Sequence, residues 1–117
     1  MAGGVAAIWG NLNSTGEYSN KDALKCFSIF WNDKNRFKKD MAADTTLSKA
    51  YCLTDYSYYV FYQEDTETIS FSFTGEKKNV IAVDTKKKYQ ELKIGKLNEG
   101  RHEFKAPYQS DWVLWIE

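Results

Sequence analysis

The second half of the chain alternates between apolar and polar positions with the period of a β-strand. Ile69, Phe71 and Phe73, for example, are separated by single serines. A period of two is typical of a strand that has one buried and one exposed face. The predicted strands cover residues 48–54, 56–62, 68–73, 79–83, 89–94, 101–105 and 111–117. We therefore predict a mainly β protein, an antiparallel β-sandwich of about six to eight strands.

One amphipathic helix is predicted before the strands, from about residue 20 to residue 35. Its apolar positions follow one stripe at helical spacing, and the largest members of that stripe are Phe27, Phe30 and Trp31. Three large aromatic side chains need a partner surface. We expect the helix to dock on the sheet through them. The alternative is an exposed stripe that serves as an interface for another domain or a second copy. Residues 5–9 have the apolar character of a short strand.

The composition restricts the classes of partner. The chain has 117 residues, with 16 basic and 16 acidic side chains and a formal net charge of zero. This length predicts one domain with an appended element, which we divide into a helical segment, 1–48, and a β-sandwich, 49–117. A neutral chain lacks the basic surface of a general nucleic-acid binder, and we expect the lysines at 86–88 to be a solvated turn. No apolar run is long enough to cross a membrane, and the start has no basic segment typical of a signal peptide.

Residues able to carry out chemistry are sparse. His102 is the only histidine, so we expect it to lie on the surface rather than in a catalytic triad. Glu64, Asp65 and Glu67 crowd a predicted turn, where acids are usually solvated. Cys26 and Cys52 match no zinc spacing, and two buried free thiols are favoured over a disulfide. We therefore predict no catalytic residue, no metal site and no cofactor.

Aromatic side chains are the best candidates for ligand contact. They make up 16% of the chain, and the negative face of an aromatic ring can stack on the C–H groups of a sugar. Trp115 has the opposite strand phase from Trp112, so burying one tends to expose the other. Tyr89 and Tyr108 stand beside predicted turns. These three residues are our candidate ligand-binding residues. The opposing interpretation is that a second sheet or the helix covers Trp115 and makes it part of the core.

Several short motifs resemble one known family. They are residues 59–62, the turn 83–85, the sequence Gly100-Arg-His, and the ending Ala106-Pro107 with residues 111–114. Through them, residues 58–117 resemble the small C-terminal β domain of a family of bacterial glycoside hydrolases with a TIM-barrel catalytic domain. That β domain carries the label of a collagen-binding domain. The first 48 residues look like the last strand and helix of the barrel and the link that follows.

The resemblance implies a non-catalytic accessory domain of a carbohydrate-active enzyme. It would bind carbohydrate weakly or serve as a packing module for the barrel. An extracellular adhesion module that binds a protein such as collagen is the alternative from another class. The implied partners are a polysaccharide and a missing TIM-barrel catalytic domain, with neither nucleic acid nor a membrane. The parent family is secreted or periplasmic. Because the seven earlier barrel strands are missing, the chain looks like the tail of a longer enzyme without the catalytic acids.

Overall fold

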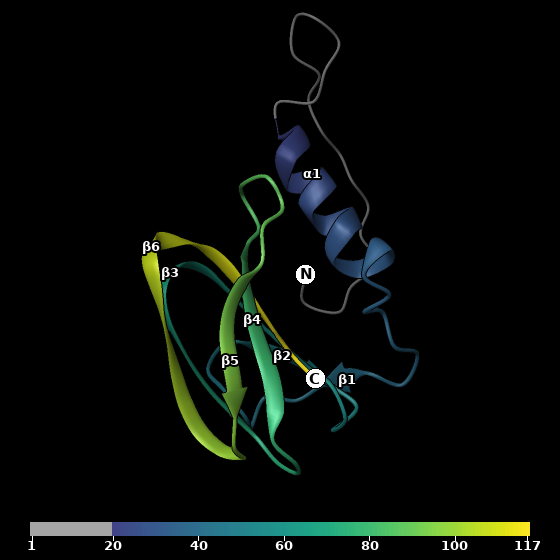
Figure 1. Cartoon of the computed structure of the whole chain (residues 1–117), viewed down its shortest axis with the longest axis vertical. Coiled ribbons are helices and arrows are strands. Elements are labelled where there is room, and N and C mark those ends of the chain that lie inside the picture. The colour runs from purple at the N-terminus through teal and green to yellow at the C-terminus, as the bar shows by residue number, and fades with distance from the viewer. Residues whose placement is uncertain (1–19) are drawn as a thin grey trace, which may run out of the picture.

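Residues 20–117 fold into a single antiparallel sheet with one helix packed on it. The computed structural model describes residues 20–117, so the predicted strand at 5–9 lies outside the described residues. The sheet order is β1-β2-β3-β6-β4-β5. Its strands are β1 (Ala42–Ala43), β2 (Tyr51–Thr54), β3 (Tyr59–Phe73), β4 (Lys78–Asp84), β5 (Leu92–Leu97) and β6 (Gly100–Ile116). The predicted class, mainly β and antiparallel with one N-terminal helix, is confirmed (Figure 1).

Two long strands, β3 and β6, form the centre of this sheet and bend together. Their register shifts between Gln63 and Thr66 and again between Thr66 and Thr68. Thr66 pairs with Ser110 and Thr68 pairs with Lys105, so β6 has three more residues than β3 over this interval. Such bulges bend a strand sharply. The turn predicted around Glu64, Asp65 and Glu67 is therefore wrong, because this segment is a bend inside one continuous strand.

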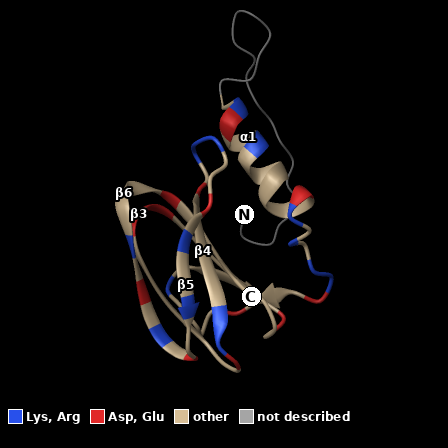
Figure 2. Cartoon of the chain, in the orientation of Figure 1, with Lys and Arg blue, Asp and Glu red and all other residues tan. Residues whose placement is uncertain are grey.

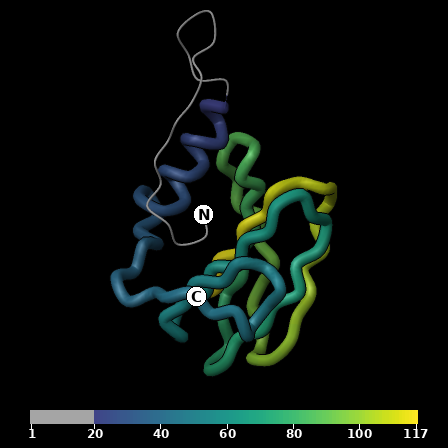
Figure 3. Tube along the Cα trace, turned by 180° about the vertical axis from the view of Figure 1, so that it is seen from behind, coloured from purple at the N-terminus to yellow at the C-terminus, as the bar shows by residue number. Residues whose placement is uncertain are grey.

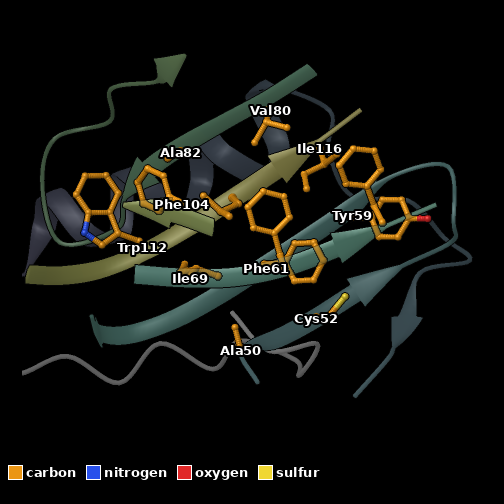
Figure 4. Packing of buried hydrophobic residues seen from close by; sticks show 13 residues of the cluster. Ala50, Cys52, Tyr59, Phe61, Ile69, Val80, Ala82, Phe104, Trp112 and Ile116 are labelled. Atoms are coloured by element: carbon orange, nitrogen blue, oxygen red, sulfur yellow. The ribbon is translucent and has the colours of Figure 1, made fainter. Parts of the chain in front are cut away.

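The bend folds the β3–β6 pair over itself and encloses an inner cluster of buried side chains. The ring centroids of Phe61 and Phe71, both on β3, lie 5.4 Å apart, and those of Phe104 and Trp112, both on β6, lie 5.5 Å apart. The two layers of the predicted sandwich are therefore the two halves of the same long strands. Figure 4 shows Phe61, Phe104 and Trp112 among the side chains that lie between the strands. The inner cluster consists of Ala50, Cys52, Tyr59, Phe61, Ile69, Phe71, Phe73, Val80, Ala82, Phe104, Trp112, Leu114 and Ile116.

The helix covers the opposite side of the sheet. α1 (Lys21–Ser28) continues into the π-helical turn η1 (Ile29–Asp33), close to the helix predicted for residues 20–35. The wider turn shows in the hydrogen bond from the Arg36 backbone N–H to the Trp31 carbonyl, five residues back. Phe30 is fully buried and Trp31 is 8% exposed, so the predicted docking on the sheet is confirmed. The outer cluster consists of Cys26, Phe30, Trp31, Val60, Tyr62, Val83, Val113 and Trp115, with Phe27 packed against it.

The two cysteines belong to opposite sides of the sheet. Cys26 lies in the outer cluster and Cys52 in the inner cluster, and both are buried free thiols. The interpretation as two free thiols is therefore confirmed. Their separation follows from the fold, because Cys26 lies on α1, which covers the outer face of the sheet, whereas Cys52 on β2 points into the inner cluster.

The connection between β4 and β5 lies beside the helix. Figures 1 and 3 both show this hairpin next to α1. Figure 2 shows that its tip is basic, and Lys86, Lys87 and Lys88 are exposed there. β5 begins at Leu92 rather than at the predicted residue 89, so Tyr89 belongs to the hairpin.

Residues 20–117 contain no helix that is both long and apolar enough to cross a membrane. The division at residues 48 and 49 stays a prediction.

Candidate functional site

Trp115 has the predicted strand phase but is not exposed. It points away from Trp112, Leu114 and Ile116, into the outer cluster. Only 2% of its surface is accessible, because the helix places Phe30 edge-on to the indole, with centroids 6.4 Å apart. Tyr58 stacks on the indole at 5.4 Å. The exposed platform predicted at Trp115 is therefore wrong, and the indole is part of the core.

Tyr89 lies in the contact between the helix end and the β4–β5 hairpin. Its hydroxyl accepts a hydrogen bond from Arg36 Nη1 at 2.8 Å and donates one to Glu91 Oε1 at 2.6 Å. Arg36 also binds Glu91 directly at 2.8 Å, although the arginine is only 7% exposed. Burial is the main reason that the pKa of Tyr89 rises to about 12. Tyr89, one of the three candidate ligand-binding residues, thus holds a buried arginine through its hydroxyl.

Arg36 and Glu91 form the main ionic contact between helix and hairpin. The guanidinium carbon lies 4.8 Å from the Phe30 ring centroid and 5.4 Å from that of Trp115. Partial burial acts to raise the pKa of Glu91, but hydrogen bonds from Tyr89 and Arg36 hold it below its ordinary value overall. A buried charge of this kind is stable only with a partner, so the pair fixes the hairpin against the helix end.

Tyr108 is the one predicted site residue that is exposed. Its accessible fraction is 38%. Lys87 Nζ lies 3.8 Å from the ring centroid, and the ring also contacts Trp112 of the inner cluster at 5.4 Å. Trp115 and Tyr89 instead pack in or against the outer cluster. The three predicted residues therefore do not form one common surface.

Sequence reasoning missed an aromatic pair on β2 and β3. Tyr51 and Tyr62 are cross-strand partners, and their rings stack with centroids 6.4 Å apart and planes at 26°. Tyr62 is 9% exposed whereas Tyr51 is 61% exposed. Alternation along β2, where Cys52 joins the inner cluster, was the available signal that Tyr51 points the other way.

Polar side chains surround the buried member of this pair. The Tyr62 hydroxyl donates to Glu64 Oε1 at 3.4 Å. Burial, then the negative charges of Asp111 and Glu64, raise the pKa of Tyr62 to about 12. Asp111 Oδ1 in turn accepts hydrogen bonds from Lys86 Nζ at 3.0 Å and from the Asp65 backbone N–H at 2.9 Å. The tyrosine pair therefore adjoins a polar group at the strand bend that is rich in carboxylates.

Asp84 lies deeper at this end of the sheet and is 7% exposed. Its Oδ1 accepts hydrogen bonds from the Lys86 backbone N–H and the Ser110 hydroxyl, both at 2.9 Å. Its Oδ2 is buried without a hydrogen-bond partner among the described residues. Within residues 20–117, no group of three or more histidine, cysteine or acidic side chains is arranged to hold a metal ion. Asp84 thus anchors the β4–β5 hairpin to β6.

His102 packs against aromatic residues of the inner cluster. Its ring stacks on Phe73 with centroids 5.5 Å apart, and its Nε2 lies 2.7 Å from the Asn98 carbonyl oxygen. The half-buried ring therefore extends the inner cluster at the β5–β6 connection. No nucleophile contacts the imidazole among the hydrogen bonds of the described residues.

Comparison with known proteins gives a likeness of fold. No family model and no curated protein matches the chain. Among solved structures, a glycoside hydrolase matches with a TM-score of 0.62 and 18% sequence identity. The match covers 80% of this chain and 23% of that chain. The chain thus has the fold of a part of a glycoside hydrolase and spans about a quarter of that protein's length. The resemblance seen in the sequence is supported at the level of the fold.

Proposed function

We propose that the chain is a non-catalytic accessory β domain of a carbohydrate-active enzyme and that it binds carbohydrate weakly. The observation that carries this proposal is the fold match, because most of this chain corresponds to a minor part of a much longer glycoside hydrolase. Such a proportion is expected of a module attached to a catalytic domain. Function does not follow from fold alone, so the proposal also depends on the exposed aromatic and carboxylate groups of the surface.

The side chains support a role without catalysis. The well-buried or half-buried acids Asp84, Glu91 and Asp111 each have a structural partner: Ser110, Arg36 and Lys86 respectively. A general acid or base needs access to substrate and a suitable pKa, and these acids instead hold the hairpin to its neighbours.

A packing role is the second candidate, and Phe37 favours it. This side chain is 74% exposed and contacts the buried Trp31 edge-on, with centroids 6.3 Å apart. A large exposed aromatic residue beside the core is typical of an interface residue. In this role the domain would use Phe37 against the catalytic domain of its enzyme.

Sedimentation with insoluble polysaccharides tests the proposal. The purified chain is mixed with cellulose, chitin, xylan or mannan, and with fibrillar collagen as a protein ligand. The pellet is assayed for protein and the supernatant for reducing sugar. Retention on a polysaccharide without sugar release is expected. Retention on collagen alone would favour the adhesion module, sugar release would contradict the non-catalytic role, and no retention would favour packing.

A further inference from the structure

Tyr51 is a large aromatic ring that is both exposed and held in place. Its position on β2 is fixed by pairing with β3, and its ring rests on Tyr62, which is itself 9% exposed and part of the outer cluster. An aromatic side chain has few rotatable bonds, and stacking restricts them further, so little conformational entropy remains to be lost on binding. A fixed ring with 61% of its surface exposed meets the physical requirements of a stacking platform.

Hydrogen-bonding groups lie beside Tyr62, the residue that supports the Tyr51 ring. Tyr62 connects the platform to Glu64 through its hydroxyl, and Glu64 is exposed at the strand bend. Gln109 Nε2 binds Asp65 Oδ1 at 2.8 Å in the same group. Carboxylate oxygens accept strong hydrogen bonds from hydroxyl donors, and a sugar carries several hydroxyls around an apolar ring face. The combination of one aromatic face and adjacent acceptors fits that ligand chemistry.

The local charge restricts the class of sugar. Glu64, Asp65 and Asp111 contribute three carboxylates, and Lys86 is an ammonium group bound to one of them, Asp111. This excess of negative charge repels uronic acids and sulfated sugars, since like charges at short range oppose binding. A neutral sugar has no such penalty and still offers hydroxyl donors.

We propose that Tyr51, supported by Tyr62 and flanked by Glu64, binds a pyranose ring of a neutral polysaccharide. The C–H face of the sugar would stack on the Tyr51 ring while its hydroxyls donate to the Glu64 carboxylate. This assignment rests on the proposed function and gives it a site and a substrate class. A shallow platform of this kind offers few convergent groups, so the dissociation constant is expected to be about 0.1–1 mM.

Other exposed rings fit this role less well. Lys87 lies over the Tyr108 ring at 3.8 Å and occupies that face. Tyr56 is as exposed as Tyr51, at 61%, but it meets Tyr59 edge-on. Its hydroxyl donates at 2.8 Å to Asp44, whose Oδ1 already binds Thr46. Tyr56 therefore provides a matched control: the same residue type with the same exposure and no stacked support.

Affinity electrophoresis in native gels tests the site, with barley β-glucan and konjac glucomannan as neutral probes and polygalacturonate as the charged probe. Wild type, Tyr51→Ala, Tyr51→Phe and Tyr56→Ala are compared, and thermal melting of each variant confirms that it is folded. A neutral probe is expected to retard the wild type and Tyr56→Ala equally. Tyr51→Ala should weaken binding at least about tenfold, and Tyr51→Phe less than about threefold, because the ring remains.

The outcomes separate the site from the proposed function. If a neutral probe retards Tyr51→Ala and wild type equally, the assignment to Tyr51 is overturned while the accessory carbohydrate-binding function stands. If only polygalacturonate retards the wild type, the charge argument and the site are both overturned. If no polysaccharide retards the wild type, the site and the binding role fail together, and the packing role associated with Phe37 remains.

Discussion

The ring centroids of Tyr59 and Phe73, the first and last residues of β3, lie 6.0 Å apart. Two ends of one strand meet in this way only because the strand doubles back at the bulges between Gln63 and Thr68. The Tyr59 hydroxyl also reaches the Thr74 side chain, at 3.3 Å. The bend thus creates the inner cluster, and it also places Glu64 and Asp65 beside the Tyr51–Tyr62 pair.

The bend depends on Asp65, which has a φ of 48°. We predict that Asp65→Val destabilises the protein by about 1–2 kcal/mol relative to Asp65→Gly, because a β-branched residue is strained in the left-handed region that glycine adopts freely. Both variants lose the same carboxylate, so their difference isolates the backbone effect. Urea unfolding measures it. Equal stability of the two variants would show that the bend does not need a positive φ.

The contact between helix and sheet depends on Trp31. We predict that Trp31→Ala lowers the free energy of unfolding by about 3–5 kcal/mol, as expected when a buried aromatic side chain is removed. Phe37→Ala is the control, since this neighbouring ring is 74% exposed and its loss should cost less than about 1 kcal/mol. Chemical denaturation compares both with wild type. A small effect at Trp31 would mean that the helix does not pack on the sheet.

The Arg36–Glu91 pair should make stability depend on pH. The pKa of Glu91 is held below its ordinary value of 4.5 in the folded protein. The ion pair therefore contributes its full stabilisation at a pH above the pKa that Glu91 has in the unfolded chain. This stabilisation is lost as the pH falls through the pKa of Glu91 in the folded protein. We predict that Glu91→Gln costs about 1–2 kcal/mol at pH 7, and that the difference from wild type shrinks below about pH 4.5. Urea unfolding across this pH range measures both curves, and a constant difference would contradict the ion pair.

The sequence predicted the class of fold because the relevant signals are local. Alternation in β3 and β6 and the aromatic stripe of Phe27, Phe30 and Trp31 each identify an element from neighbouring residues. The strand phase of Trp115 was also correct. Its burial was not predictable from phase, because the covering residue, Phe30, is distant in sequence and reaches the indole only through tertiary packing.

The bend between Gln63 and Thr68 also could not be predicted from neighbouring residues alone. Three acids between residues 63 and 68 are equally compatible with a solvated turn and with a bulge, since both place polar side chains in water. Only the pairing of Thr66 with Ser110 on β6 distinguishes them. Tyr51 was missed for a similar reason: its ring is held in place only because its cross-strand neighbour is Tyr62, with which it stacks.

Chemical-shift mapping by NMR is a direct test of whether a neutral sugar binds at Tyr51. A neutral oligosaccharide, such as cellohexaose or mannohexaose, is titrated into the ¹⁵N-labelled chain while backbone amides and tryptophan indole N–H groups are observed. We predict saturable shifts centred on Tyr51, Tyr62 and Glu64, with the buried Trp115 indole unaffected. Shifts centred on Tyr108 and Lys87, or no saturable shift for any neutral oligosaccharide, would contradict this prediction.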